Sequence, residues 1–242
     1  MQNHGPLIIS LDVSTRAALF SFIEQFSPDE KLTIKIGMEL FYGEGPRIVR
    51  DLLNRGYDVF LDLKLHDIPN TVKNGMKQIG KLGVAFTTVH ALGGSAMINQ
   101  AKQGLIEGAE EAGVQPPKLL AVTELTSITP EGLANEQNSK LSMVDQVVSL
   151  ANLAKQSGAD GVITSPLEVE ALRAAVGDDF WYVTPGIRPK DFPKDDQSRT
   201  ATPAEAATVG SSTLVVGRPI INANDSVATY HKMLEEWQNA NR

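Results

Sequence analysis

Eight short apolar runs, rich in β-branched residues, recur along the chain at fairly even intervals, and each is followed by an amphipathic segment of helical period. This alternation is typical of βα units that build a parallel sheet. The eight units average about 30 residues, the size of one βα step. An open doubly wound sheet could use the same units, but eight strands without a break favour closure into a barrel. The expected strands are residues 7–11, 32–36, 58–63, 85–90, 119–125, 161–164, 181–184 and 213–216.

The predicted fold is an α/β fold of the (β/α)₈ TIM barrel type, formed by a single domain over residues 1–242. Two helix starts are well marked, by Ser-Pro-Leu-Glu at 165–168 and Thr-Pro-Ala-Glu at 202–205. Each combines an N-cap hydroxyl, a proline at the first helical position and a glutamate three residues after the cap. Gly83, Gly158 and Gly210 lie where helices should end before the next strand.

Charge and composition narrow the classes of function. Lys and Arg total 22 against 29 Asp and Glu, and the net charge of −7 disfavours nucleic acid and anionic membranes as partners. The chain has no cysteine, which excludes disulfides, thiolate zinc sites and cysteine nucleophiles and suits a reducing compartment. No signal sequence is recognisable, and no apolar run approaches the ~20 residues of a membrane span. We expect a cytoplasmic protein with a small-molecule substrate.

Charged side chains stand at the ends of five expected strands. In a (β/α)₈ barrel the active site lies at the carboxyl ends of the strands, where buried core positions would not otherwise carry charges. The sequence therefore places the active site there. The residues are Asp12 after the first strand, Lys35 in the second, Asp62 and Lys64 in the third, Arg188 after the seventh and Arg218 after the eighth, with Thr126 after the fifth.

Asp62 and Lys64 should point into the barrel mouth, because side chains two residues apart share one face of a strand. They could form a purely structural ion-pair network with Lys35 and Asp12, but four such charges together favour a functional site. Each pair interacts with ~4 kcal/mol at 4 Å and an effective dielectric near 20, which keeps the lysines protonated. A protonated lysine is a poor Schiff-base nucleophile and a good proton donor to a carbanion. Asp62 could orient Lys64 and crowd an anionic group that the reaction removes, such as a carboxylate that leaves as carbon dioxide.

The last two βα loops are the usual phosphate site of this fold. Gly217 and Arg218 offer a close backbone and a guanidinium, Arg188 adds a charge, and Gln197 lies in the polar segment 190–202, which we interpret as a functional loop.

Asp67 follows the third strand in a turn that Pro69 fixes, and Asn70 or Thr71 could cap the next helix. For His66 we favour a structural role. The position of His90 at the end of the fourth strand is equally consistent with a pocket residue and with a hydrogen-bonded core histidine.

Seven segments of the chain resemble the orotidine 5′-phosphate decarboxylase family of the bacterial type, over essentially the whole length. The ten residues DLKLHDIPNT at 62–71 are highly specific, and the others follow in the family's order. These are LDV at 11–13, KIG at 35–37, VTELTS at 122–127, DGVITSPLE at 160–168, VTPGIRP at 183–189 and LVVGRPI at 214–220.

The resemblance implies a homodimeric carboxy-lyase that converts orotidine 5′-monophosphate to uridine 5′-monophosphate through a carbanion at C6, without metal or organic cofactor. Lys64 would donate the proton to C6, and Asp62 would face the departing carboxylate. Asp67 and Thr71 would complete the site of the neighbouring subunit. The implied catalytic residues are Lys64, Asp62, Lys35 and Asp67, and the implied substrate-binding residues are Asp12, Lys35, Asp67, Ile68, Thr71, Thr126, Arg188, Gln197, Gly217 and Arg218.

One departure from the family is visible, since many relatives carry cysteine where this chain has Thr164. The nearest alternative is the 3-keto-L-gulonate 6-phosphate decarboxylase or hexulose phosphate synthase group, which uses magnesium and needs a carboxylate where this chain has Lys35. A catalytically silent nucleotide-binding barrel is a second alternative. It would have no need to keep Lys35, Asp62, Lys64 and Asp67 together.

Overall fold

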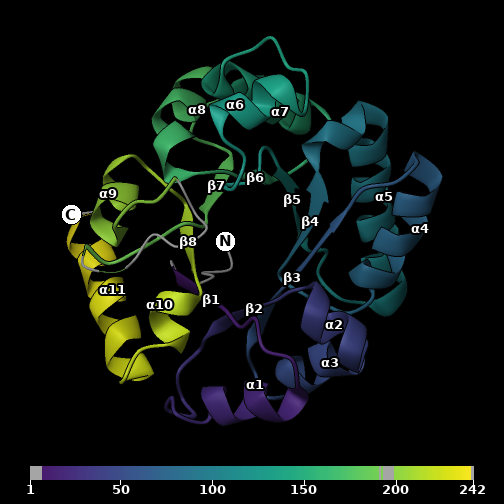
Figure 1. Cartoon of the computed structure of the whole chain (residues 1–242). Coiled ribbons are helices and arrows are strands. Elements are labelled where there is room, and N and C mark those ends of the chain that lie inside the picture. Colours follow the sequence, from purple (N-terminus) through teal and green to yellow (C-terminus); the bar gives the residue numbers. More distant parts are fainter. Residues whose placement is uncertain (1–6, 191, 193–198, 241–242) are drawn as a thin grey trace.

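Eight parallel strands close into a barrel in this computed structural model, which describes residues 7–190, 192 and 199–240 (Figure 1). Each strand pairs with its neighbour in sequence, and β8 pairs with β1. The predicted (β/α)₈ barrel is confirmed. The strands are β1 (Leu7–Ser10), β2 (Thr33–Ile36), β3 (Asp58–Leu65), β4 (Phe86–His90), β5 (Lys118–Val122), β6 (Gly161–Ile163), β7 (Trp181–Thr184) and β8 (Thr213–Val216).

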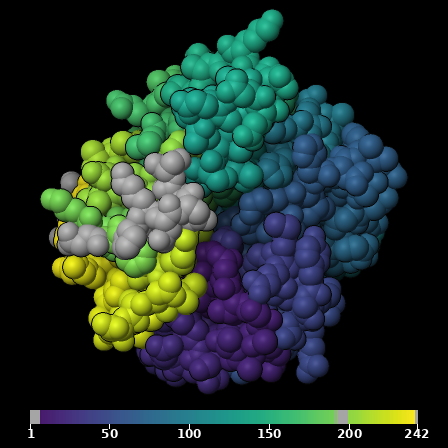
Figure 2. All heavy atoms as spheres, in the orientation of Figure 1, coloured from purple at the N-terminus to yellow at the C-terminus, as the bar shows by residue number. Residues whose placement is uncertain are grey.

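Helices form an outer ring around the barrel, and the all-atom view shows a hollow near the centre of one face (Figures 1 and 2). Among the described residues, no helix has both the length and the apolar character needed to cross a bilayer. The helices are α1 (Arg16–Ile23), α2 (Met38–Glu44), α3 (Arg47–Asn54), α4 (Pro69–Gly80), α5 (Gly94–Ala112), α6 (Pro130–Asn135), α7 (Met143–Gln156), α8 (Val169–Val176), α9 (Pro203–Thr208), α10 (Arg218–Ile221) and α11 (Ser226–Ala240), with 3₁₀ turns η1 (Ala91–Gly93) and η2 (Pro166–Glu168).

The predicted strands coincide with the observed ones except at some ends. β3 continues to Leu65, past the predicted end at residue 63. β5 ends at Val122, so residues 123–126 belong to the loop that follows it. Asp12 likewise lies beyond β1, which ends at Ser10. Both segments therefore reach the barrel mouth as loops.

Two apolar layers hold the barrel together. Inside it, Phe60 and Phe86 meet with ring centroids 5.8 Å apart, and Trp181 packs 5.5 Å from Phe86. Outside it, Leu61 and Leu63 of β3 belong to the large buried cluster between strands and helices. The alternation along β3 is the predicted one and turns the intervening residues towards the barrel axis. The inner layer consists of Ile8, Phe60, Phe86, Leu120, Val183 and Val215.

Most local signals in the sequence have the predicted effect. Thr202 and Glu205 form a capping box at the start of α9. The Ser165 hydroxyl accepts a hydrogen bond from the backbone N–H of Leu167, although the helix it begins is first a 3₁₀ turn, η2. Gly83, Gly158 and Gly210 adopt φ values of 77°, 91° and 88°, which L side chains rarely adopt, and so end the preceding helical segments.

The start of α4 differs from the prediction. Pro69 is itself the first helical residue, Ile68 is the N-cap, and no side chain caps the helix. The prediction that Asn70 or Thr71 caps this helix is therefore wrong. The N–H that proline lacks would have no partner inside the helix, and its fixed φ suits the first helical turn, so the helix can start on the proline itself.

α4 and α5 lie side by side and approach each other through glycines (Figure 1). A Cβ atom added to Gly104 or Gly108 of α5 would overlap the backbone carbonyl of Lys73 or Lys77 of α4. Lys73 also pairs with Glu107 at 2.7 Å. The glycines thus allow a backbone contact that fixes the place of α4, whose first turn follows directly on the end of β3.

Candidate active site

A pocket of about 230 Å³ opens at the carboxyl ends of the strands. Phe60, from the inner apolar layer, lies on its inner side, so the packed core closes the pocket towards the barrel interior. Most of the predicted site residues are brought together here. Those that line the pocket are Asp12, Lys35, Asp62, Lys64, Thr126, Arg188, Gly217 and Arg218.

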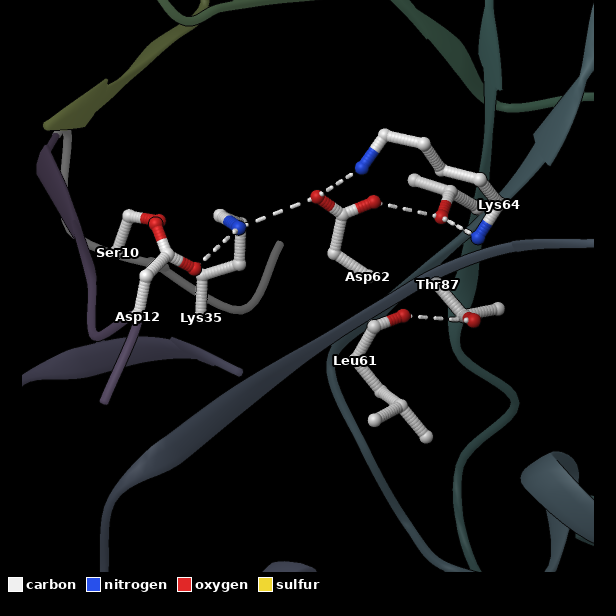
Figure 3. A network of polar contacts seen from close by, with 8 residues as sticks. Ser10, Asp12, Lys35, Leu61, Asp62, Lys64 and Thr87 are labelled. Atoms are coloured by element: carbon white, nitrogen blue, oxygen red, sulfur yellow. Dashed lines mark hydrogen bonds and ion pairs between the residues drawn. The ribbon is translucent and has the colours of Figure 1, made fainter. Parts of the chain in front are cut away.

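Asp62 lies between two ammonium groups (Figure 3). Its Oδ2 atom is 2.8 Å from Nζ of Lys64 and 3.2 Å from Nζ of Lys35. Lys35 also lies 3.7 Å from Oδ1 of Asp12, which accepts a hydrogen bond from Ser10 through its other oxygen. The predicted array of two lysines and two aspartates is therefore present. It joins the ends of β1, β2 and β3.

Asp62 is a carboxylate at neutral pH. Burial alone would raise its pKa, but the charges of Lys35 and Lys64, with hydrogen bonds from Lys64 and Thr88, hold the pKa below its ordinary value of 3.8. Only 9% of the side chain is exposed, whereas 26% of the Lys64 side chain is exposed. The array therefore presents a fixed negative charge with an ammonium group beside it.

β3 departs from regular strand geometry within the array. Leu61 pairs with Thr87 and Leu65 pairs with Val89, so the β3–β4 register shifts over residues 62–64. Lys64 adopts φ 50°, a left-handed conformation that is uncommon for a residue other than glycine. Both side chains still point into the pocket as predicted, but on an irregular rather than a pleated backbone.

Arg188 and Arg218 lie on the wall formed by β7 and β8, across the barrel from β3. Arg188 is buried, and its Nη1 atom donates to the carbonyl of Ile187 at 2.9 Å. Gly217 precedes α10, and a Cβ atom there would lie 3.3 Å from the backbone oxygen of Ser10. The pocket therefore has cationic groups on two opposite sides. The predicted phosphate contact Gln197 lies outside the described residues.

Asp67, Ile68 and Thr71 are exposed and do not line the pocket of their own chain in the described part of the protein. Oδ1 of Asp67 accepts a hydrogen bond from the backbone N–H of Ile68 at 2.6 Å. Ile68 is 67% exposed, which is unusual for a large apolar side chain. These three predicted site residues are thus exposed and separate from the charge array of their own chain.

His66 and His90 pack against each other, with ring centroids 5.6 Å apart, and neither is among the described residues that line the pocket. Burial, and then the neighbouring charges of His66 and Lys64, lower the pKa of His90. His90 is therefore neutral at neutral pH. The structure favours the structural interpretation of both histidines.

Three residues with polar side chains that line the pocket were not predicted from the sequence: Ser10, Glu124 and Thr164. Glu124 is buried, and its two oxygens accept hydrogen bonds from Gln137 at 3.0 Å and Gln146 at 3.2 Å. The two-residue period that predicted the inward direction of Asp62 would also have predicted that Glu124 points into the pocket, because Glu124 continues the inward face of β5 beyond Val122. The Thr164 hydroxyl is buried without a hydrogen-bond partner among the described residues.

A buried ion pair connects the loops that follow β5, β6 and β7 beside the pocket. Nη1 of Arg199 lies 2.7 Å from Oε1 of Glu168 in η2, and Nη2 donates to the carbonyl of Leu125 at 2.9 Å. Burial raises the pKa of Glu168 even with this partner. Nearby, the backbone N–H of Arg188 donates to the carbonyl of Ala201. The loops after β5, β6 and β7 are thus held in fixed relation.

The chain is similar to known proteins over nearly its whole length. The model of the orotidine 5′-phosphate decarboxylase / HUMPS family matches residues 5–233. The relative from Lactobacillus acidophilus named orotidine 5′-phosphate decarboxylase is 56% identical over 232 residues, 96% of this chain and 98% of the relative. That from Lactococcus lactis subsp. cremoris, of the same name, is 48% identical over 237 residues, 98% of this chain and 99% of the relative.

Solved structures show the same likeness. The crystal structure of the Lactobacillus acidophilus orotidine 5′-phosphate decarboxylase matches with a TM-score of 0.87 and 53% identity, covering 96% of this chain and 98% of that one. An uncharacterized conserved protein from Geobacillus kaustophilus matches with a TM-score of 0.82 and 37% identity, covering 96% of this chain and all of that one. With sequence and structure alike over nearly the whole length, the chain belongs to the orotidine 5′-phosphate decarboxylase / HUMPS family.

Proposed function

We propose that the protein decarboxylates orotidine 5′-monophosphate to uridine 5′-monophosphate and carbon dioxide, the last step of de novo UMP biosynthesis, in the cytoplasm. The observation that carries the proposal is the buried carboxylate of Asp62 with two ammonium groups within 3.2 Å of one of its oxygens. Family membership and the names of the close relatives support the same substrate.

The array suits the loss of a carboxylate that is replaced by a proton. The substrate carboxylate at C6 would lie against Asp62, and breaking the bond to C6 releases it as neutral carbon dioxide, which relieves the repulsion. The electron pair of that bond stays on C6, where the Lys64 ammonium can donate a proton. Lys64 then regains its proton from solvent, so the atoms and charges balance without a cofactor.

The two arginines suit the other end of this substrate. Arg188 and Arg218 line the wall opposite Asp62, where a 5′-phosphate would lie with the nucleoside spanning the pocket. Thr126 lines the pocket after β5 and would contact the pyrimidine, while Asp12 and Lys35 would contact the ribose. Binding energy from the remote phosphate can then offset the crowding at C6.

We expect turnover without metal. The loss of orotidylate absorbance is measured in metal-free buffer that contains a chelator, and the expected result is the same rate as in buffer with added magnesium. Lys35 lies between Asp12 and Asp62, where its ammonium group would repel a divalent cation. Activity only after magnesium is added would contradict the proposal and favour the metal-dependent members of the family.

The proposed enzyme is a homodimer whose sites are each completed by the partner. Exposed apolar side chains follow the ends of three consecutive strands: Met38 and Tyr42 in α2, Ile68 after β3 and Leu92 in η1. They are 46%, 72%, 67% and 46% exposed, and such a concentration is typical of a protein interface. Asp67 and Thr71 lie beside Ile68 and would reach the pocket of the other subunit.

Mixed dimers of Lys64→Ala and Asp67→Ala chains should regain activity that each variant lacks alone. One of the two sites then combines Lys64 of one chain with Asp67 of the other, so dimers purified with two different tags should show about half the activity of the wild type. Dimers of Lys64→Ala and Asp62→Ala chains are the matched control. They should stay inactive, because both residues serve the pocket of their own chain. No recovery in the first mixture would show that Asp67 does not act across an interface.

A further inference from the structure

Thr88 of β4 contacts both members of the central pair. Its hydroxyl donates a hydrogen bond to Oδ1 of Asp62 at 2.9 Å and accepts one from the backbone N–H of Lys64, also at 2.9 Å. The residue is fully buried and is not among the residues that line the pocket. Thr88 can therefore act on the reaction only through Asp62 and Lys64.

The chemistry of the three groups fixes the direction of both hydrogen bonds. An ionised carboxylate can only accept, and a backbone N–H can only donate. The single proton of the Thr88 hydroxyl is thus committed to Oδ1 of Asp62. Oδ2 is left to face the two ammonium groups of Lys35 and Lys64. The carboxylate has one orientation that satisfies all of these partners.

Thr88 also lies where β3 and β4 lose their register. Between the pairs Leu61–Thr87 and Leu65–Val89, three residues of β3, 62–64, lie opposite the single residue Thr88 of β4. A threonine hydroxyl thus bonds the backbone N–H of Lys64 at the point where φ is 50°. A left-handed residue persists only where its surroundings determine it, and this hydrogen bond is one such determinant.

We propose that Thr88 is a positioning residue of the reaction, whose one hydroxyl fixes the carboxylate of Asp62 and the backbone of Lys64 together. It thereby sets the place of the ammonium group relative to the carboxylate. The inference rests on the proposed function, because the roles of Asp62 and Lys64 belong to that proposal. Displacement of a reacting group by about 1 Å can lower the rate by as much as 10²-fold.

Thr87 provides a matched control on the same strand. It is equally buried, and its hydroxyl donates to the backbone carbonyl of Leu61 at 2.9 Å, on the face away from the pocket (Figure 3). Thr88→Val and Thr87→Val each replace a buried hydroxyl by a methyl group of similar shape. Both variants should lose thermal stability, but only one breaks a contact to the reacting groups.

Steady-state kinetics on the full-length variants test the inference. Thr88→Val is expected to lower kcat about 10- to 10²-fold with little change in KM. Thr87→Val should keep the wild-type kcat. Where Thr88→Val does not fold, Thr88→Ser and Thr88→Ala replace it: both lose the methyl group, and only the serine variant, which keeps the hydroxyl, should retain near-wild-type kcat.

The pH profile separates positioning from a general loss of stability. Removing the Thr88 hydrogen bond should raise the pKa of Asp62, so the acid limb of kcat/KM moves to higher pH in Thr88→Val and stays in place in Thr87→Val. The other charges that face Asp62 are the same in both variants. They are the charges of Lys35, Lys64 and Asp12, and His90 is a further titratable group nearby.

The possible results are distinguishable. A wild-type enzyme without turnover contradicts the proposed function itself. With an active wild type, the expected result is a selective loss of kcat and a shifted acid limb in Thr88→Val, with rescue by serine. Equal kcat in Thr88→Val and wild type, equal losses in the Thr87 and Thr88 variants, or equal kcat in Thr88→Ser and Thr88→Ala would each overturn the positioning role.

Discussion

Replacing Lys64 by alanine should lower kcat on the order of 10²- to 10⁴-fold, the usual contribution of a positioned proton donor. The Lys64 ammonium lies 2.8 Å from Asp62 and is the more exposed of the two lysines of the array, so it is the one able to reach a carbanion at C6. Binding of uridine 5′-monophosphate should persist, because Lys35 still neutralises Asp62 and the arginine wall is unchanged. Single-turnover kinetics and calorimetric titration with the product measure the two effects separately.

Lys102→Ala is a suitable control for this variant. Lys102 also pairs with an aspartate, Asp160, at 2.5 Å, but it lies on α5 and does not line the pocket. Its loss should affect stability and leave kcat at the wild-type value. Retained turnover in Lys64→Ala would remove Lys64 from the proposed role, and equal losses in both variants would indicate a general effect of removing a lysine.

Gly108→Ala should destabilise the fold by about 3 kcal/mol, near the upper end of ordinary overpacking. The new methyl group would overlap the backbone carbonyl of Lys77, and backbone cannot move aside as a flexible side chain can. For a chain of this size the melting temperature should fall by roughly 6–12 °C. Thermal unfolding followed by circular dichroism measures the shift.

Gly132→Ala is the matched control for that substitution. Gly132 lies in α6, and its added Cβ would meet its nearest neighbour at an ordinary contact distance of 3.6 Å. Alanine is the better helix former by about 1 kcal/mol, so stability should stay the same or rise. An unchanged melting temperature of the Gly108→Ala protein would contradict this prediction and show that α4 can shift on α5 without loss of stability.

Much of this architecture could be predicted from the sequence because it depends on local periodicity. The eight βα units follow from alternating apolar patterns, and the closed barrel follows from their number and their unbroken order. The inward direction of Asp62 follows from the two-residue period of a strand, whereas Lys64 points inward on an irregular backbone. The capping box of Thr202 and Glu205 is encoded within four residues, so it could be recognised without any tertiary information.

The features that could not be predicted depend on contacts between distant residues. The irregular backbone at Lys64 arises from pairing with β4, and its partner Thr88 lies 24 residues further along the chain. Glu124 is held by glutamines from the α6–α7 region, which no local pattern links to β5. The buried pair of Arg199 and Glu168 likewise joins two separate loops.

The left-handed backbone of Lys64 has a consequence for how the protein can change. A residue other than glycine in this conformation costs on the order of 1 kcal/mol, and glycine would remove that cost. The ion pair of Lys64 with Asp62 at 2.8 Å acts in the opposite direction, and Lys64→Gly would lose this pair together with the proposed proton donor. Backbone strain and charge compensation are thus coupled at this one position, because a substitution that relieves the strain leaves Asp62 with Lys35 as its remaining ammonium partner.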